Sequence, residues 1–403
     1  MPVKHPLPPS SARPVRLSDI QGLARLATAG VAGVSQIAEG VHASVLRSMG
    51  MGGAAPSGAT GGLTGLIYRS VRGVTRLVGG GIDATLAPLV RWLDDPTSAS
   101  PPAREAALAA LNGVLGDRLA ASGNPLATTM RLRHATTPPV GGRVALLIHG
   151  LCMNDLQWRD TETGHDHGDQ LAALGYTPVY LVYNTGRPIA DNGADLAHQL
   201  ETWLASWPQP VEELLVLAHS MGGLVARSAC HQAQRDGLRW PALLRTLVFL
   251  GTPHHGAPLE RAGNWVDQVL GSTRYSAPFA RLGHLRSAGI TDLRHGNVRR
   301  EDHAGPDRFA AGPDTRTPLP LPAGVACYTI AASSGRQRSP MAERLLGDGL
   351  VPLRSALGEH ADPAHTLAFP PAHRHIVWGA GHFALLHHPG VTKQLEVWLA
   401  TNG

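Results

Sequence analysis

The stretch "LLVLAHSMGG", residues 214–223, decides how the rest of the chain is interpreted. Apolar residues lead into a histidine and Ser220, and two glycines follow. Small residues such as Ala218 and Gly222 on either side of a serine are typical of a tight turn from a buried strand into a helix, because the two backbones approach closely there. The stretch therefore predicts that Ser220 is a nucleophile at such a turn. The alternative is a serine that only caps the helix.

Apolar runs of similar length recur along the C-terminal two thirds of the chain. Each ends in a polar residue or a glycine; the runs occupy residues 143–150, 177–184, 213–220, 245–251 and 325–333. Helical patterns lie between them, at residues 168–174, 192–203 and 222–235. Buried strands that alternate with helices predict an α/β fold with a mostly parallel sheet covered on both faces. Ligands bind at the carboxyl ends of such strands, where this chain has His149, Asn184, Ser220 and Gly251.

The first 138 residues have a different pattern. They contain 13 Lys and Arg against 7 Asp and Glu, whereas the remaining residues contain 22 against 23. Helices are expected at residues 17–47, 63–93 and 102–121, with a linker rich in Gly, Ala, Pro and Ser at 49–62. We therefore expect an N-terminal helical segment over residues 1–138 and an α/β domain over residues 139–403.

Three arginines recur on one side of the second expected helix. Arg69, Arg72 and Arg76 lie opposite apolar residues at positions 67, 71 and 78. The favoured interpretation is a solvated face of a helix that packs on the α/β domain. The alternative is a peripheral contact between these basic helices and a membrane or another anionic lipid surface.

The hydropathy pattern bears on where the protein resides. No apolar run reaches the roughly 18–20 residues that a membrane-spanning helix needs. The N-terminal stretch is amphipathic and lacks the continuous apolar core of a signal peptide. We expect a cytoplasmic protein, with membrane association and secretion left open.

The composition disfavours several kinds of site and partner. The three cysteines have no CxxC spacing, so neither a disulfide framework nor a cysteine zinc site is expected. Histidine clusters at 165–167, 253–255 and 373–375 lack a carboxylate or cysteine at metal-ligand spacing, so no metal is expected. We expect no cofactor and, without an aromatic and basic motif, no nucleic-acid partner. The oligomeric state is left open.

A serine nucleophile needs a base and an acid that orients it. The stretch "LLGDGLVPLRSA" places Asp348 in a glycine turn after the run at 325–333, and it is favoured over Glu359 and Asp362. The stretch "GAGHFALLHHPGV" places His382 in a loop flanked by glycine. His382 is favoured over two further histidines, at 387 and 388, which lie beside a proline. The residues after His382 are expected to form the terminal helix.

The reaction also needs hydrogen-bond donors for the oxyanion. The backbone N–H of Met221, directly after Ser220, is the first candidate. The second is the N–H of Leu151, because "LLIHGLCMND" follows an apolar run at the same expected edge of the sheet. His149 and His219, which flank these positions, are expected to contact substrate.

Five segments together resemble the serine α/β-hydrolases of the lipase and esterase type, close to bacterial members of the GPI-inositol-deacylase-like branch. They are "HGL" (149–151), "AHSMGGLVAR" (218–227), "LGTPHHGAPLERAG" (250–263), "GDGLVP" (347–352) and "GAGHFALL" (379–386). The resemblance implies an α/β-hydrolase fold with helices on both faces of the sheet. It also implies a cap insertion, about residues 254–322, after "GTPHHG". In that cap, Trp265, Val269 and Leu270 are expected either to line an acyl pocket or to form the core of the cap.

The resemblance and the order Ser220, Asp348, His382 imply a hydrolase of small-molecule or lipid carboxylic esters that works through an acyl-enzyme. An acyltransferase, a thioesterase or an amidase on the same three residues is the alternative. A non-catalytic lipid-binding module is less favoured, because such proteins usually lose a member of the triad.

Overall fold

A computed structural model of the protein describes residues 16–48, 62–93, 100–134, 141–257, 286–302, 314–335 and 347–401. The chain divides into two compact units. We call them the sheet unit (residues 1–7, 105–120 and 128–403) and the hairpin unit (residues 8–104 and 121–127). Each is described by itself.

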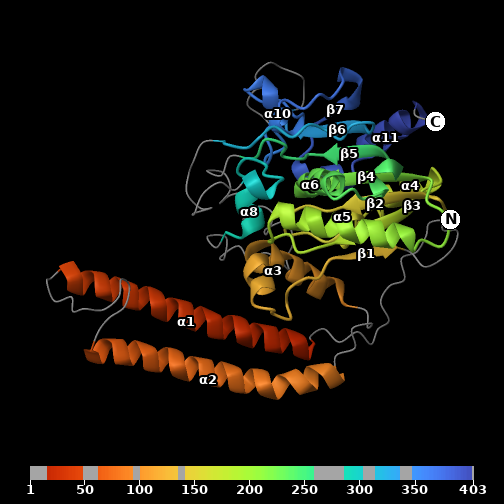
Figure 1. Ribbon diagram of the computed structural model, residues 1–403. Coiled ribbons are helices and arrows are strands. Elements are labelled where there is room, and N and C mark those ends of the chain that lie inside the picture. Colours follow the sequence, from red (N-terminus) through yellow and green to blue (C-terminus); the bar gives the residue numbers. More distant parts are fainter. Residues whose placement is uncertain are drawn as a thin grey trace. The chain divides into compact units, whose positions relative to one another are not determined.

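The sheet unit is built on a seven-stranded sheet with the strand order β1-β3-β2-β4-β5-β6-β7 (Figure 1). The strands are β1 (Arg131–His134), β2 (Arg143–Ile148), β3 (Thr177–Val182), β4 (Glu213–His219), β5 (Leu244–Leu250), β6 (Ala326–Ser333) and β7 (Arg374–Trp378). All neighbouring strands are parallel except β1, which pairs antiparallel with β3. The expected mostly parallel sheet is therefore confirmed, and β2 to β6 coincide with the five apolar runs.

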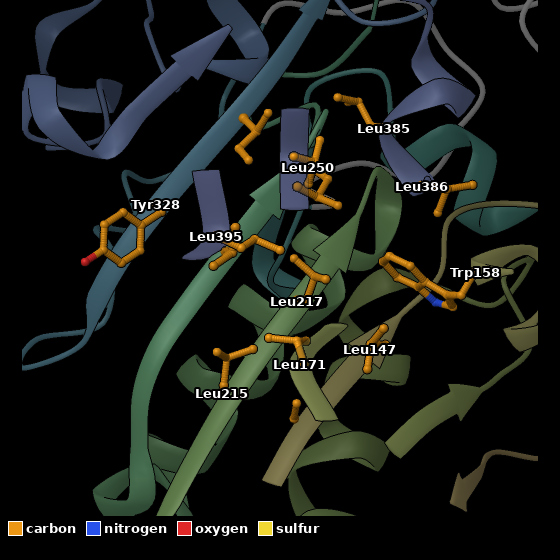
Figure 2. Close-up of a cluster of buried hydrophobic side chains, with 14 of the residues drawn as sticks. Leu147, Trp158, Leu171, Leu215, Leu217, Leu250, Tyr328, Leu385, Leu386 and Leu395 are labelled. Atoms are coloured by element: carbon orange, nitrogen blue, oxygen red, sulfur yellow. The ribbon is translucent and has the colours of Figure 1, made fainter. Parts of the chain in front are cut away.

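Apolar side chains from both faces of the central strands form the core. Leu215 and Leu217 of β4 belong to a buried cluster with Leu171 of helix α4 (His167–Ala173) and Leu395 of helix α11 (Pro389–Thr401) (Figure 2). Successive strand residues point to opposite faces, so the equally buried residues between them face the other side. Helices α5 (Ile189–Ala205) and α6 (Met221–Arg235), which pack against each other, cover that side.

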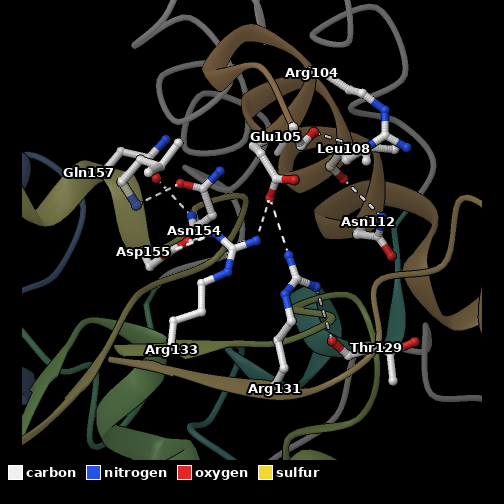
Figure 3. Close-up of polar contacts among 12 residues, drawn as sticks. Arg104, Glu105, Leu108, Asn112, Thr129, Arg131, Arg133, Asn154, Asp155 and Gln157 are labelled. Atoms are coloured by element: carbon white, nitrogen blue, oxygen red, sulfur yellow. Dashed lines mark hydrogen bonds and ion pairs between the residues drawn. The ribbon is translucent and has the colours of Figure 1, made fainter. Parts of the chain in front are cut away.

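Ion pairs attach the edge strand β1 to helix α3 (Pro102–Ala121). Glu105 accepts from Arg131 and Arg133 at 3.3 Å each, and Arg133 also reaches Asp155 at 3.0 Å (Figure 3). The sequence pattern gives no sign of β1, because "RLRH" has the charged composition of a short edge strand. The N-terminal helical segment is expected to extend to residue 138, whereas the structure groups Glu105–Ala120 and the chain from Thr128 with the sheet.

The hairpin unit contains two long helices, α1 (Leu17–Ser48) and α2 (Gly62–Leu93), which pack against each other. They coincide with the first two expected helices, and α3 coincides with the third. Within the described part of the chain, no helix is both long and apolar enough to span a membrane.

The end of the chain differs from the expected single helix. A 3₁₀ helix at His382–Leu386 is followed by a break, and α11 begins at Pro389. Proline fits the first position of a helix because its missing N–H is not needed there, whereas inside a helix it would remove a hydrogen bond. The cap is described only at residues 254–257, 286–302 and 314–322, where it includes helix α8 (Ala288–Asp292).

Candidate functional site

Ser220 occupies a strained turn between β4 and α6. Its φ of 54° and ψ of −126° lie outside the regions that ordinary residues prefer. Among the described residues other than glycine, only Cys152 also has a positive φ. Such a conformation costs about 1–3 kcal/mol and persists only where the surroundings hold it. Here the N–H of Ser220 donates to the carbonyl of Leu250, at 2.8 Å, which fixes the turn on the neighbouring strand.

The two glycines after Ser220 have no room for a side chain. A methyl group at Gly222 would lie 2.6 Å from the carbonyl oxygens of Ile148 and His149. At Gly223 it would lie 2.1 Å from Oγ1 of Thr252. The start of α6 thus packs directly on the ends of β2 and β5, as the small residues in "HSMGG" predict.

Asp348 and His382 form a buried pair. The two side chains are 1% and 2% exposed, and Oδ2 of Asp348 lies 2.6 Å from Nδ1 of His382. The other carboxylate oxygen, Oδ1, accepts from the N–H groups of Leu350 and Val351 at 2.9 and 2.7 Å. The backbone N–H of His382 also donates to the carbonyl of Asp348, at 3.1 Å, so both the ring and the backbone of His382 are bonded to Asp348.

Two further glycines bring these groups together. A methyl group at Gly251, where φ is 57°, would lie 3.2 Å from Cε1 and Nδ1 of His382. A methyl group at Gly150 would lie 3.0 Å from Cβ of Ser220. Since Ser220 is bonded to Leu250, the residue before Gly251, the ends of β2, β4 and β5 and the loop of His382 meet at one edge of the sheet. The sequence places Gly251 at the end of a strand but does not reveal its contact with His382.

The structure leaves the serine and the imidazole unbonded. Nε2 of His382 is buried and has no hydrogen-bond partner within the described chain, Ser220 included. In enzymes without substrate, hydrogen bonds between nucleophile and base are often long or poorly aligned. Nε2 is therefore available to accept a proton, while Nδ1 is committed to Asp348.

A comparison of the sequence with protein families also indicates an α/β domain in this part of the chain. Residues 139–310 match the family described as the PGAP1-like alpha/beta domain. The sheet unit has the α/β-hydrolase fold. No curated protein sequence matches the chain.

Solved structures that resemble the chain are distant in sequence. Bacillus licheniformis lipase BlEst2 in mature form is 17% identical over 67% of this chain and 97% of that chain, with a TM-score of 0.41. Aspergillus fumigatus lipase B is 13% identical over 94% of this chain and 83% of that chain, with a TM-score of 0.37. The RedJ thioesterase of Streptomyces coelicolor is 18% identical over 67% of this chain and 96% of that chain, with a TM-score of 0.36.

The two other candidate acids, Asp362 and Glu359, are bonded to groups other than His382. The carboxylate of Asp362 accepts from the N–H of Ala364 at 2.9 Å, so it caps a 3₁₀ turn. Glu359 pairs with Arg374 at 3.1 Å. Neither is bonded to His382, so of the three candidate acids the structure brings only Asp348 to that histidine.

The competing histidines are also engaged elsewhere. His387 lies 3.6 Å from the carboxylate of Asp160, and its Nε2 donates to the carbonyl of Gln157 at 3.1 Å. Nδ1 of His388 accepts from the N–H of Gly390 at 3.0 Å. Both histidines lie in the break before α11, and neither is bonded to Asp348.

The two backbone N–H groups that the sequence predicts as oxyanion donors, those of Met221 and Leu151, lie at this edge. Met221 is the first residue of α6, and the first N–H groups of a helix have no acceptor within it. Leu151 is buried, and within the described chain its N–H donates to no group. The next N–H, that of Cys152, donates to Oγ1 of Thr185 at 3.1 Å, and Cys152, like Ser220, has a positive φ.

His149 and His219 are completely buried at this edge. Burial lowers the pKa of His149 to about 4 and holds the pKa of His219 well below its ordinary range. The ring of His149 stacks on Tyr183 at 4.5 Å, and Nε2 of His219 lies 3.2 Å from the carbonyl oxygen of His382. Both rings are neutral at pH 7, and their burial suits them to support the site rather than to touch substrate.

The remaining predicted residues give no site in the structure. Trp265, Val269 and Leu270 lie outside the described residues. Within the described ranges, no group of three or more His, Cys, Asp or Glu is arranged to hold a metal ion. In the cluster at 165–167, for example, His167 is bonded through its two nitrogens to Thr392 and to the carbonyl of Leu385.

Proposed function

We propose that the protein hydrolyses carboxylic esters through Ser220, His382 and Asp348. One observation carries this proposal. A buried carboxylate holds Nδ1 of His382, Nε2 of the same ring is free, and the ring packs on Gly251 beside the strained turn of Ser220. A serine hydroxyl needs such an oriented base to become a nucleophile.

In the first step, Oγ of Ser220 attacks the ester carbonyl carbon while its proton passes to Nε2 of His382. Asp348 stabilises the imidazolium that forms, through the hydrogen bond from Nδ1. The tetrahedral intermediate then loses the alcohol, which takes the proton from His382, and an acyl-Ser220 ester remains.

In the second step, His382 removes a proton from water, which attacks the acyl-Ser220 carbonyl. The acid leaves and the serine regains its proton. In both steps the negative charge develops on the former carbonyl oxygen, where the N–H groups of Met221 and Leu151 would donate. Removing one such donor typically costs a factor of about 10²–10³ in rate.

The test is hydrolysis of p-nitrophenyl esters, from acetate to palmitate, by the full chain and by Ser220→Ala. We expect kcat to fall by about 10⁴-fold or more, because the nucleophile is lost. Ser228→Ala is the matched control, since Ser228 is a second buried serine and lies on α6, the helix that follows Ser220. Full turnover by a folded Ser220→Ala variant would overturn the proposal, and the preferred chain length would define the acyl group.

A further inference from the structure

The hairpin unit carries most of the large apolar side chains that the structure leaves exposed. Of fourteen such residues in the described chain, eleven lie on α1 and α2. We call them the apolar face: Ile20, Leu23, Val31, Val34, Leu66, Ile67, Val71, Val74, Leu77, Val78 and Ile82. Leu77 is 78% exposed and Val34 is 68% exposed. Eleven residues on two adjacent helices exceed the scattered apolar exposure that is normal for protein surfaces.

The seven residues of the face on α2 form a continuous stripe. At 100° per residue, positions 66 to 82 of this set fall within an arc of about 160°. An arc of this width is what an amphipathic helix presents to an apolar environment. The spacing therefore indicates one continuous apolar surface rather than isolated exposed residues.

The residues between α1 and α2 are instead small or polar. Gln21, Ser35 and Glu39 are each less than 10% exposed. A methyl group at Gly79 would lie 2.5 Å from Oγ1 of Thr28, so the two helices approach closely there. The apolar residues consequently point away from the partner helix, and the hairpin does not bury them itself.

Within the described residues, the acids of the two helices are all paired with arginines, whereas some arginines are not paired with acids. Three acids lie on α1 and α2, and each pairs with an arginine: Asp19 with Arg104 at 2.6 Å, Glu39 with Arg72, and Asp83 with Arg25 at 2.5 Å.

Two exposed arginines of α2, Arg69 and Arg76, lie on the polar side of this helix, opposite the apolar stripe at 100° per residue. Within the described chain they have no carboxylate partner. The polar side of α2 therefore carries uncompensated positive charge.

We propose that the apolar face of α1 and α2 binds an anionic lipid surface, with the helices lying in the plane of the interface. An apolar stripe on one side of a helix and cations on its polar side are the pattern of helices that insert their apolar side chains below the headgroups. Guanidinium groups such as those of Arg69 and Arg76 pair with phosphate, and each adds about 1 kcal/mol of attraction to an anionic membrane.

Flotation of the full chain with vesicles tests this proposal. Vesicles of phosphatidylcholine alone are compared with vesicles containing one third phosphatidylglycerol. We expect the chain to float with the anionic vesicles, and the binding to weaken as salt is raised. Val74→Gln with Leu77→Gln should lower the partition by about tenfold or more, because two exposed anchors are replaced without disturbing buried contacts.

Two matched variants separate the contributions. Arg69→Gln with Arg76→Gln should weaken binding to the anionic vesicles by about tenfold and change binding to neutral vesicles little. Val397→Gln, which alters an exposed valine on α11 of the sheet unit, should change neither. Turnover of a soluble p-nitrophenyl ester should be unchanged in all of them, so a failure here is distinct from a failure of the proposed ester hydrolysis.

Three results would overturn the proposal. The first is a full chain that does not float with anionic vesicles. The second is equal flotation of the wild-type chain and Val74→Gln with Leu77→Gln. The third is conversion of a dimer into a monomer by the same double substitution, measured by light scattering, which would show that the face binds a second copy.

Discussion

The two units of this protein place apolar and polar side chains in opposite ways. In the sheet unit, strand residues such as Leu215 and Leu217 are completely buried, and polar groups gather at the ends of the strands. In the hairpin unit, Glu39 and Ser35 are buried between the helices while Leu77 is exposed. The first arrangement builds a core with a reactive edge. The second leaves its large apolar side chains exposed.

The difference shows how burial acts on chemistry in each unit. At the edge of the sheet, burial removes Asp348 and His382 from water, and each finds the other as its hydrogen-bond partner. Between α1 and α2, burial of Glu39 is compensated by Arg72, so the charge serves the packing of two helices. At the edge of the sheet, Nε2 of His382 is left without a hydrogen-bond partner in the described chain.

The largest effect is expected where the polar edge of the sheet unit is broken. Asp348→Asn should lower kcat by about 10⁴-fold, because an amide donating to Nδ1 of His382 would hold the ring in the wrong tautomer. Steady-state kinetics with a p-nitrophenyl ester measures this. Asp362→Asn changes a second carboxylate of the same domain and should leave kcat unaltered. The reverse outcome would move the acid to Asp362.

The next effect compares two leucines, one in each unit. Leu217→Ala should lower the free energy of unfolding by about 3–5 kcal/mol, since it opens a cavity in a filled core. Leu77→Ala should change it by no more than about 0.5 kcal/mol, because that side chain is 78% exposed. Denaturant unfolding measures both. A loss of several kcal/mol at Leu77 would mean that the apolar face is packed within the protein.

A smaller effect is expected from acid, through the buried histidines of the sheet unit. Burial lowers the pKa of His149 to about 4, from an ordinary value of 6.5. Above pH 6.5 the ring is neutral in both the folded and the unfolded chain. Between pH 6.5 and 4 the unfolded chain binds a proton that the folded chain does not, so stability falls as the pH falls.

His149→Phe tests this dependence. Its free energy of unfolding should decline by about 2–3 kcal/mol less than that of the wild-type chain between pH 7.5 and 4.5. His198→Phe alters an exposed histidine on α5 and should leave the wild-type pH dependence in place. Parallel pH curves for His149→Phe and the wild type would show that His149 titrates normally.

Much of the sheet was predictable from the sequence because buried parallel strands are continuous apolar runs. The runs "ELLVLAHS" and "RVALLIHG" became β4 and β2 within a residue or two of their expected ends. The edge strands β1 and β7 were not predicted. Their segments, "RLRH" and "RHIVW", are short and only partly buried, so hydrophobic periodicity gives little signal.

The candidate site was predictable to the extent that it depends on the ends of strands. Asp348 and His382 were selected from their loops, and the structure places them 2.6 Å apart; their catalytic roles, like that of Ser220, remain predictions. The contacts of Gly150 and Gly251 were not predictable, because a close approach between segments far apart in the sequence depends on the completed fold.

Covalent labelling of Ser220 tests the central claim most directly. A fluorophosphonate probe is added to the folded chain, and the modified residue is located by mass spectrometry of the digested protein. The account predicts modification at Ser220, and labelling strongly reduced in Asp348→Asn, because His382 would no longer activate the hydroxyl. A folded wild-type chain that takes up no probe, or takes it up at another residue, would contradict the account.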